Sequence, residues 1–143
     1  MGKKFFISLI WPILVMIGLY LIASIPGEME KDPSNIQLFF TWFSPAVHNM
    51  LHVPAYALLA WTLYRSLFLY SSFWIVSFGV VALASGYGAF LEWHQLTIPG
   101  RYASFTDVVL NFIGAVIGVF FSSRYIKTFR FAPNLINKPE KRE

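Results

Sequence analysis

The sequence predicts an all-α integral membrane protein, a four-transmembrane-helix bundle with both termini on the cytoplasmic side. The first observation is composition: 57% of the 143 residues are hydrophobic and 13% are charged, whereas about 25% of residues are charged in soluble domains. The second is distribution, because the charges cluster and leave long uncharged runs. The third is the length of these runs, which approach the roughly 20 helical residues that cross a bilayer.

The first predicted helix covers residues 5–25, an uncharged run that follows two lysines. Pro12 is expected to kink this helix or to lie in its first turn. A cleaved signal peptide is the alternative, because Ala23-Ser24-Ile25 loosely resembles a cleavage site. The run is longer than a signal-peptide core and Pro26 follows directly, so we favour a retained membrane helix.

The connection over residues 27–45 is first polar and then aromatic. Within it, residues 36–43 are predicted to lie in the membrane interface, because aromatic side chains such as Trp42 favour that region. The segment forms either a short interfacial helix or a loop anchored by Trp42.

The second predicted helix covers residues 46–64 and ends at Arg65. His48, His52 and Tyr56 follow one another at intervals of four and therefore share a helix face. Tyr56 is expected to pack in the core with one hydrogen bond. His48 and His94 do not belong to the polar faces of the next two predicted helices, and both are expected at the surface.

The third and fourth predicted helices, residues 72–93 and 106–123, form a hairpin around the turn Pro99-Gly100-Arg101. Each helix has one face of polar and small residues. The first of these faces carries Ser85, Gly88, Glu92 and Gln95, and the second carries Asp107, Asn111, Gly114 and Gly118. The small-xxx-small spacing of the last two glycines, with Gly88 opposite, predicts close helix packing.

The basic residues predict the orientation. In a four-span topology, the N-terminal lysines, Arg65 and the basic tail share one side, whereas the other side has only Lys31 and Arg101. The positive-inside rule then places both termini in the cytoplasm. Residues 1–130 form a single transmembrane domain, and residues 131–143 are expected to be a disordered basic cytoplasmic tail.

Two classes of function are excluded by composition. The chain has no cysteine, so disulfide and thiol chemistry are absent. The net charge of +4 accompanies no recognised RNA- or DNA-binding motif, and we predict no nucleic-acid partner.

The predicted topology brings polar groups of three helices to the outer end of the bundle. Counting back about 20 residues from Arg124 places Asp107 and Asn111 below the membrane surface, where polar groups must be paired, hydrated or turned inward. We therefore predict a polar pocket that opens to the outer leaflet. Its acid–base candidates are His52, Glu92 and Asp107. Its ligand-binding candidates are Tyr56, Gln95, Arg101, Ser104 and Asn111.

Each of these groups also has a purely structural interpretation. Ser104-x-x-Asp107 fits a capping box at a helix start. Glu92 and Arg101 fit a salt bridge that closes the turn. Asn111 fits an interhelical hydrogen bond, and His52 fits an interfacial histidine bonded to a carbonyl.

The chain resembles the VanZ-like family of small bacterial membrane proteins. The resemblance rests on the following motifs and residues, in this order: His52-x-x-x-Tyr56, Glu92-x-x-Gln95, Pro99-Gly100-Arg101, Ser104, Asp107, Asn111, Gly114 and Gly118. The family takes its name from an accessory protein of teicoplanin resistance. The resemblance covers residues 46–121. It implies residence in the bacterial cytoplasmic membrane and a link to the cell envelope or to the antibiotic response, but it supplies no reaction.

The chain departs from the family pattern beside His52. Asn49 and Met50 stand where the family commonly has an Asp-Lys pair, and Val53 stands where an aromatic residue is common. If the missing pair helps to hold a ligand or a proton, this chain binds differently or more weakly.

Three hypotheses for function follow. The first is binding of a membrane lipid head group, a lipid-linked envelope precursor or a lipoglycopeptide. The second is an enzyme that acts on such a lipid through His52, Glu92 and Asp107. The third is an assembly role in which Gly114 and Gly118 pair with another chain. A proton-coupled transporter ranks lower, because four short helices need a homo-oligomer to form a path. No cofactor is predicted, and no metal, because the three acid–base candidates lack HExxH-like spacing.

Overall fold

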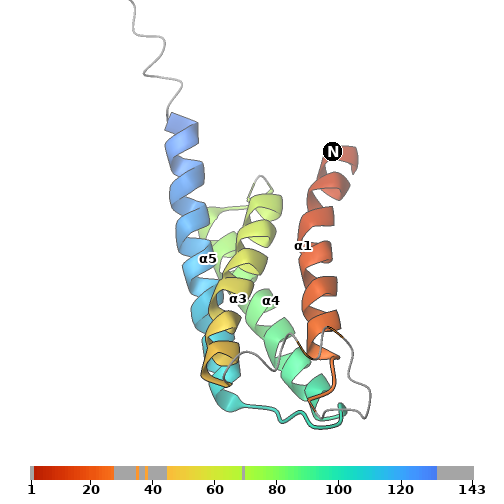
Figure 1. Cartoon of the computed structure of the whole chain (residues 1–143). Coiled ribbons are helices and arrows are strands. Elements are labelled where there is room, and N and C mark those ends of the chain that lie inside the picture. Colours follow the sequence, from red (N-terminus) through yellow and green to blue (C-terminus); the bar gives the residue numbers. More distant parts are fainter. Residues whose placement is uncertain (1, 28–34, 36–37, 39–44, 69, 132–143) are drawn as a thin grey trace, which may run out of the picture.

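The computed structural model describes residues 2–27, 35, 38, 45–68 and 70–131. This part of the chain is helical and has no strand, which confirms the all-α prediction. The helices, labelled as in Figure 1, are α1 (Gly2–Ala23), α3 (Pro45–Leu67), α4 (Phe73–Gln95) and α5 (Phe105–Phe131).

The helix boundaries differ most from prediction at the end of α5, which runs to Phe131 and not to residue 123. The prediction took Arg124 as the end of the apolar run, but a helix can continue past the membrane, and basic residues near its C-terminus interact favourably with the helix dipole. Pro12 was expected in a first turn or at a kink; it lies well inside α1 and is fully buried. The predicted interfacial segment 36–43, apart from Leu38, and the tail beyond Phe131 lie outside the described residues.

The four helices alternate in direction, so that their ends gather in two groups (Figure 1). The starts of α1 and α4 and the ends of α3 and α5 lie at one end of the bundle; we call it the basic end, because Arg65 and Arg124 belong to it. The other end, here the acidic end, gathers the start of α5 and the end of α4. Helix α3 is central and packs against α1, α4 and α5.

Three of the described helices are long and apolar enough to cross a membrane, over Phe6–Ala23, Phe73–Gln95 and Phe105–Ile126. Helix α3 is 23 residues long, sufficient for a span by length. Its histidine, asparagine and arginine residues reduce its hydropathy. A fourth span therefore remains a prediction.

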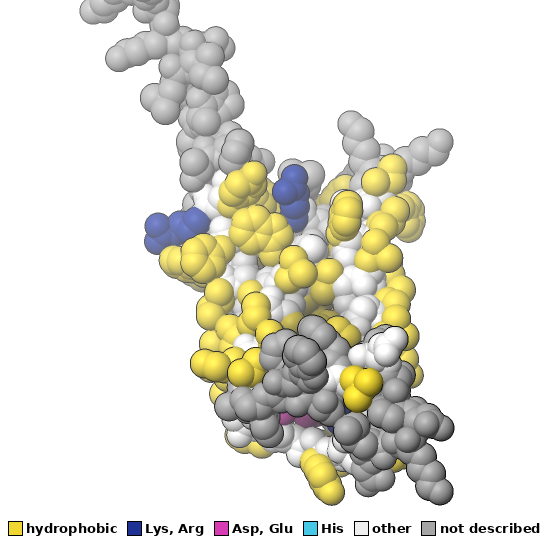
Figure 2. All heavy atoms as spheres, viewed as in Figure 1, with side chains coloured by type: hydrophobic (Ala, Val, Ile, Leu, Met, Phe, Trp, Pro, Cys, Tyr) yellow, Lys and Arg dark blue, Asp and Glu magenta, His cyan; other side chains and the backbone are white. Residues whose placement is uncertain are grey.

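Many large apolar side chains are exposed on the described helices, and Figure 2 shows them on one face of the bundle. Trp74 is 67% exposed and Phe78 is 71% exposed. Soluble monomers rarely expose large contiguous apolar patches, whereas lipid tails solvate such side chains. The surface, like the apolar helices, indicates a membrane protein.

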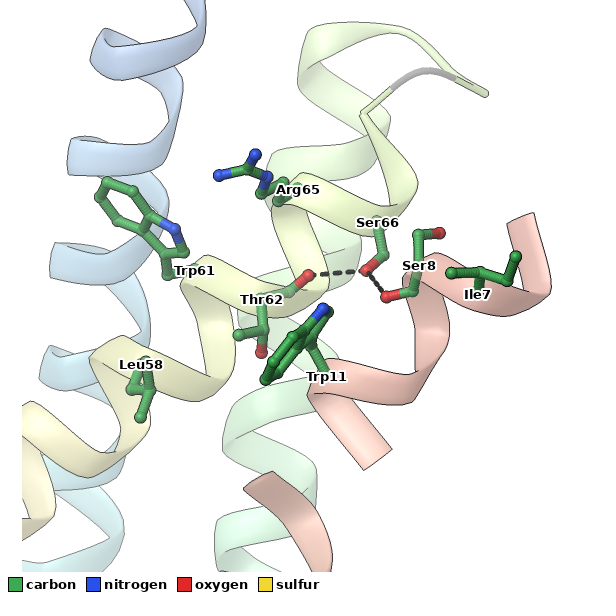
Figure 3. Close-up of a pocket in the computed structure, with 8 residues that line it drawn as sticks. All are labelled: Ile7, Ser8, Trp11, Leu58, Trp61, Thr62, Arg65 and Ser66. Atoms are coloured by element: carbon green, nitrogen blue, oxygen red, sulfur yellow. Dashed lines mark hydrogen bonds between the residues drawn. The ribbon is translucent and has the colours of Figure 1, made fainter. Parts of the chain in front are cut away.

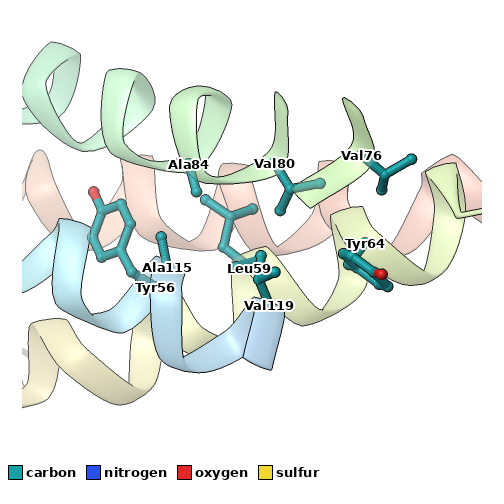
Figure 4. Close-up of a cluster of buried hydrophobic side chains, with 9 residues drawn as sticks. Tyr56, Leu59, Tyr64, Val76, Val80, Ala84, Ala115 and Val119 are labelled. Carbon is teal, nitrogen blue, oxygen red and sulfur yellow. The ribbon is translucent and has the colours of Figure 1, made fainter. Parts of the chain in front are cut away.

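Alanine and branched aliphatic side chains fill the interior between the helices, together with Tyr56 and Tyr64 (Figure 4). Ala60, Ala84 and Ala115 are fully buried around Leu59 and Val80. In lipid, helices associate mainly through close contact, because the surrounding tails are as apolar as the interface. Small side chains allow that contact here.

The glycine stripe of α5 is where the backbone of α3 comes closest. A Cβ on Gly114 would lie 2.5 Å from the carbonyl oxygen of Val53, and one on Gly118 would collide with the carbonyl of Ala57. The stripe is therefore occupied by α3 of the same chain. This finding removes the surface on which the assembly hypothesis depended.

Helix α1 is attached to α3 near the basic end by one buried hydroxyl. Ser66 Oγ donates to the carbonyl oxygen of Ser8 at 2.7 Å and lies 2.8 Å from that of Thr62 in its own helix. We expect Ser66→Ala to lower the free energy of unfolding by about 1 kcal/mol. Ser123→Ala is the matched control, since Ser123 is also buried but bonds only to Phe120 in its own helix. Equal effects in SDS-unfolding titrations would contradict the interhelical assignment.

Candidate functional site

Buried polar side chains concentrate at the acidic end of the bundle. Glu92 and Gln95 come from the last turn of α4, and Asp107 and Asn111 come from the first turns of α5. Glu92 is 4% exposed, Asp107 is 8% exposed and Asn111 has no exposed surface. Burial of so much polarity in an apolar bundle is costly unless the groups are partnered or functional.

His52 of α3 is held by Asn111 of α5. Its Nδ1 lies 2.8 Å from Asn111 Oδ1, and because an amide oxygen only accepts, Nδ1 is the donor; in the neutral imidazole, Nε2 then keeps its lone pair. Gly88 of α4 makes room for this arrangement, since a Cβ there would lie 2.6 Å from Asn111 Nδ2. Residues of α3, α4 and α5 therefore hold the His52 imidazole in place. The hydrogen bond between His52 and Asn111 joins α3 to α5, as the structural interpretation of Asn111 predicted.

The start of α5 is capped from another helix. The backbone N–H of Ser104 donates a hydrogen bond to Glu92 Oε2 at 3.0 Å. In a capping box, the same N–H would donate to the Asp107 carboxylate. Asp107 Oδ1 is buried and has no hydrogen-bond partner in the described structure. The capping-box interpretation of Asp107 is therefore wrong in its hydrogen bonds, although the carboxylate still lies in the first turn of the helix.

The three predicted acid–base residues meet at one point. His52, Glu92 and Asp107 each offer a nitrogen or oxygen ligand atom, and these atoms all lie within 4.8 Å of one another. They come from α3, α4 and α5, and more than 50 residues separate His52 from Asp107 in the chain. The sequence predicted this convergence from topology, and the structure brings the three together.

A pocket of about 320 Å³ opens beside this cluster. Its polar wall is formed by Tyr56, His52, Glu92, Gln95 and Arg101. Its apolar wall is formed mainly by leucine and isoleucine side chains: Leu19, Ile22, Leu51 and Leu91. The volume lies within the usual range for small-ligand sites.

Arg101 is positioned by the turn that follows α1. Its Nε donates to the carbonyl oxygen of Ile25 at 3.0 Å, and Gly27 N–H donates to the carbonyl of Pro99 at 3.0 Å. Within the described ranges, its terminal guanidinium nitrogens make no hydrogen bond and no ion pair joins it to Glu92. The alternative interpretation, a structural salt bridge, is therefore not supported, and two nitrogens remain available to a ligand.

His94 was expected at the surface and is instead a contact between α4 and α1. Its ring stacks on Tyr20 with centroids 4.8 Å apart, and its Nε2 lies 3.1 Å from Ser24 Oγ. The sequence did not predict this contact, because His94 belongs to neither of the two polar faces that were identified on the hairpin helices. The side chain of His48 lies outside the described structure.

Some predicted ligand-binding residues lie behind the pocket and not on its wall. Ser104 and Asn111 do not line it, so Asn111 acts on the pocket only through His52. The Tyr56 hydroxyl, expected to make one hydrogen bond, makes none with the residues described here. Gln95 likewise has no side-chain partner there. Both groups therefore retain hydrogen-bonding capacity toward the pocket.

The contribution of α1 to the pocket was missed by sequence reasoning. Leu19, Ile22 and Ala23 form part of its wall, and nothing in a uniformly apolar helix distinguishes them. One signal was present: Pro26-Gly27 and Pro99-Gly100 are matching pairs in the two turns at this end. A Cβ on Gly27 would collide with the Gly100 carbonyl, so the two turns contact each other directly.

A second hollow, of about 590 Å³, lies between α1 and α3 toward the basic end (Figure 3). Its walls include Trp11, Trp61 and Leu58, with Arg65 as its charged group. The hydroxyl of Ser66 here bonds to helix carbonyls, as the dashed lines show. The hollow contains none of the predicted site residues, so the acidic-end pocket is the candidate site.

Fold and site together define an all-helical membrane protein with a buried polar cluster and a pocket at one end of its bundle. The family model described as VanZ/LLP1 matches residues 6–127. Because this match covers most of the chain, the protein belongs to the VanZ/LLP1 family, and the resemblance inferred from the motifs is confirmed. Comparisons with curated proteins and with solved structures gave no match.

Proposed function

We propose that the protein binds an amphiphile with an anionic head group in the acidic-end pocket. The observation that carries this proposal is the pairing of Arg101, whose terminal nitrogens have no partner among described residues, with a wall of Leu19, Ile22 and Leu51 in one hollow. A guanidinium recognises phosphate or carboxylate through two parallel hydrogen bonds. The apolar wall suits the first part of an acyl chain.

Arg101 provides a cation in the wall of the pocket, beside the cluster of His52, Glu92 and Asp107. Burial lowers the pKa of Arg101, and the charge of Glu92 opposes that shift. Arginine stays protonated in proteins at neutral pH. Its charge attracts an anionic head group, while the side chains of Gln95 and Tyr56 offer further hydrogen bonds.

We propose that this pocket faces the outer leaflet of the bacterial cytoplasmic membrane. The proposal rests on the positive-inside rule, since Arg65 lies in the last turn of α3 and Arg124 in the last part of α5, at the opposite end of the bundle (Figure 1). An outward pocket meets phospholipids, lipid-linked envelope precursors and lipoglycopeptides, and these three share an anionic group joined to an acyl or isoprenoid chain. Binding of a lipid-linked envelope precursor or of a lipoglycopeptide would imply a role in the cell envelope or in the antibiotic response.

The test is lipid mass spectrometry on protein purified in nanodiscs of bacterial lipid. We expect Arg101→Ala to lower the bound anionic amphiphile by about tenfold or more, because charge-assisted hydrogen bonds contribute about 1.5–3 kcal/mol. Arg101→Lys should recover only part of the binding, since lysine lacks the planar fork. The mass of the retained species, in samples with and without added precursor or lipoglycopeptide, identifies the source.

Arg65→Ala is the matched control, because Arg65 is an arginine of the opposite end of the bundle. Equal retention in wild type and Arg101→Ala, or equal loss in both arginine variants, would contradict the proposal.

Lipid chemistry at the same pocket is the second candidate function. The observation that favours it is the buried Asp107 Oδ1, without a partner among the described residues, beside His52 and Glu92. His52 and Glu92 line the pocket, where they are able to exchange protons with a substrate, and Asp107 lies next to them outside its wall. Under this hypothesis Glu92→Gln and Asp107→Asn keep the amphiphile bound but stop its conversion. Cells with and without the protein would then differ in the mass of one lipid class, and unchanged lipid profiles would leave binding alone.

A further inference from the structure

We propose that His52, Glu92 and Asp107 form a binding site for one divalent metal ion, Zn²⁺ or Mn²⁺. Their ligand atoms lie within 4.8 Å of one another. Nitrogen and oxygen ligands bind Zn²⁺ at about 2.0–2.2 Å, so a bound ion holds its ligand atoms within about 4.4 Å, and closure of roughly half an ångström completes the site. One imidazole with two carboxylates suits both ions.

The orientation of His52 fits a metal ligand. Its Nδ1–H donates to Asn111 Oδ1 at 2.8 Å, so that the neutral imidazole offers the lone pair of Nε2 to an ion. Histidines that bind metals nearly always donate their other ring N–H to a carboxylate or carbonyl oxygen, which fixes the tautomer and the ring. Asn111 has no exposed surface, and its side-chain hydrogen bond in the described structure is the one that its Oδ1 accepts from His52, while its Nδ2 has no partner there. It is therefore a positioning residue for this imidazole.

The charges of the cluster also call for a cation. Glu92 and Asp107 are 4% and 8% exposed, and no ion pair in the described structure neutralises either one. Two like charges this close repel each other, and the apolar surroundings screen that repulsion poorly. A divalent ion offsets both charges, and Asp107 Oδ1, buried without a partner, gains one.

The metal ion deepens the proposed function, because it would lie beside the polar wall of the amphiphile pocket and add positive charge opposite Arg101. Tyr56, Gln95 and Arg101 line that wall and would complete the contacts to a phosphate or carboxylate. The contact between the metal ion and a head group rests on the proposed function, whereas binding of the metal ion itself does not require an amphiphile.

The test is metal analysis of protein purified in nanodiscs, treated with EDTA, loaded with ZnCl₂ or MnCl₂ and desalted. We expect about one ion per chain for wild type and at least a tenfold loss for His52→Ala and for Asp107→Asn. Asn111→Leu should weaken metal affinity by about 10- to 100-fold. His94→Ala is the matched control: its imidazole bonds to Ser24 at the same end, and the variant should bind metal like wild type.

X-ray absorption of the wild-type protein keeps the test decisive if a variant fails to fold. The expected spectrum has nitrogen and oxygen neighbours at about 2.0–2.2 Å, one of them an imidazole. Absence of bound metal in wild type, a spectrum without imidazole, or the same stoichiometry in folded His52→Ala would overturn the inference.

The Arg101→Ala variant separates this inference from the proposed function. It should lose the amphiphile and keep the metal ion. In the wild-type protein, amphiphile bound without metal would overturn the metal site alone, and metal bound without amphiphile would overturn the proposed function alone.

Discussion

Replacement of Gly118 by valine is expected to prevent α5 from packing on α3 and to lower the free energy of unfolding by about 3 kcal/mol or more. A Cβ at this position would collide with the carbonyl oxygen of Ala57 and lie 2.9 Å from the Cβ of Ala60. The first is backbone and cannot rotate away. Helix α3 would have to move outward, and in a membrane the close contact it loses is the main source of helix association.

Gly79→Val is the matched control for that experiment. Both glycines lie inside helices, so both substitutions change helix propensity equally, but a Cβ on Gly79 meets nothing within 4 Å. The difference between the two SDS-unfolding midpoints therefore measures the contact with Ala57. Similar midpoints for the two variants would show that α3 and α5 do not approach as described.

The polar hairpin of α4 and α5 was largely predictable from the sequence. Apolar chains tolerate few hydrophilic groups, so the carboxylates, amides and glycines that interrupt the runs stand out, and helical periodicity assigns them to faces. Gly88, Gly114 and Gly118 were predicted to pack closely, and each does contact a neighbouring helix. The alternation of four helices then placed His52 at the same end as Glu92 and Asp107.

Contacts made by the turns and by α1 were not predictable in the same way. Arg101 bonds to the carbonyl of Ile25 and not to Glu92, because the turn after α1 occupies the space beside its guanidinium. A backbone acceptor has no sequence signature. Sequence patterns assign a charge to an end of the bundle but do not select among the acceptors found there.

Ser104 and Asp107 illustrate a motif whose residues are present while its hydrogen bonds are made elsewhere. The capping-box spacing is intact, yet Glu92 of α4 accepts the Ser104 N–H. A local motif is predicted from local spacing, and here a tertiary partner replaces the local one. Asp107 therefore does not accept the hydrogen bond from Ser104 N–H that would explain a carboxylate in the first turn of α5.

Asp107→Asn is accordingly expected to stabilise the metal-free protein while it removes metal binding. The carboxylate is 8% exposed, and its Oδ1 has no hydrogen-bond partner among the described residues. Replacement by the isosteric, neutral amide removes a buried unsatisfied charge, which should raise the free energy of unfolding in EDTA by about 1–2 kcal/mol. SDS-unfolding titrations of wild type and variant, each with and without the metal ion, provide the measurement.

The sign of this change distinguishes function from structure at Asp107. A carboxylate that only stabilises a helix N-terminus contributes about 0.3–1 kcal/mol, so its loss would destabilise the protein with or without metal. A residue kept for binding is instead unfavourable in the empty site. It becomes favourable once the cation is bound, because a ligand that binds only the folded state stabilises it by an amount that grows with the logarithm of its concentration relative to Kd. Destabilisation of the EDTA-treated variant would therefore contradict the binding role, since it would give Asp107 a sufficient structural reason to be where it is.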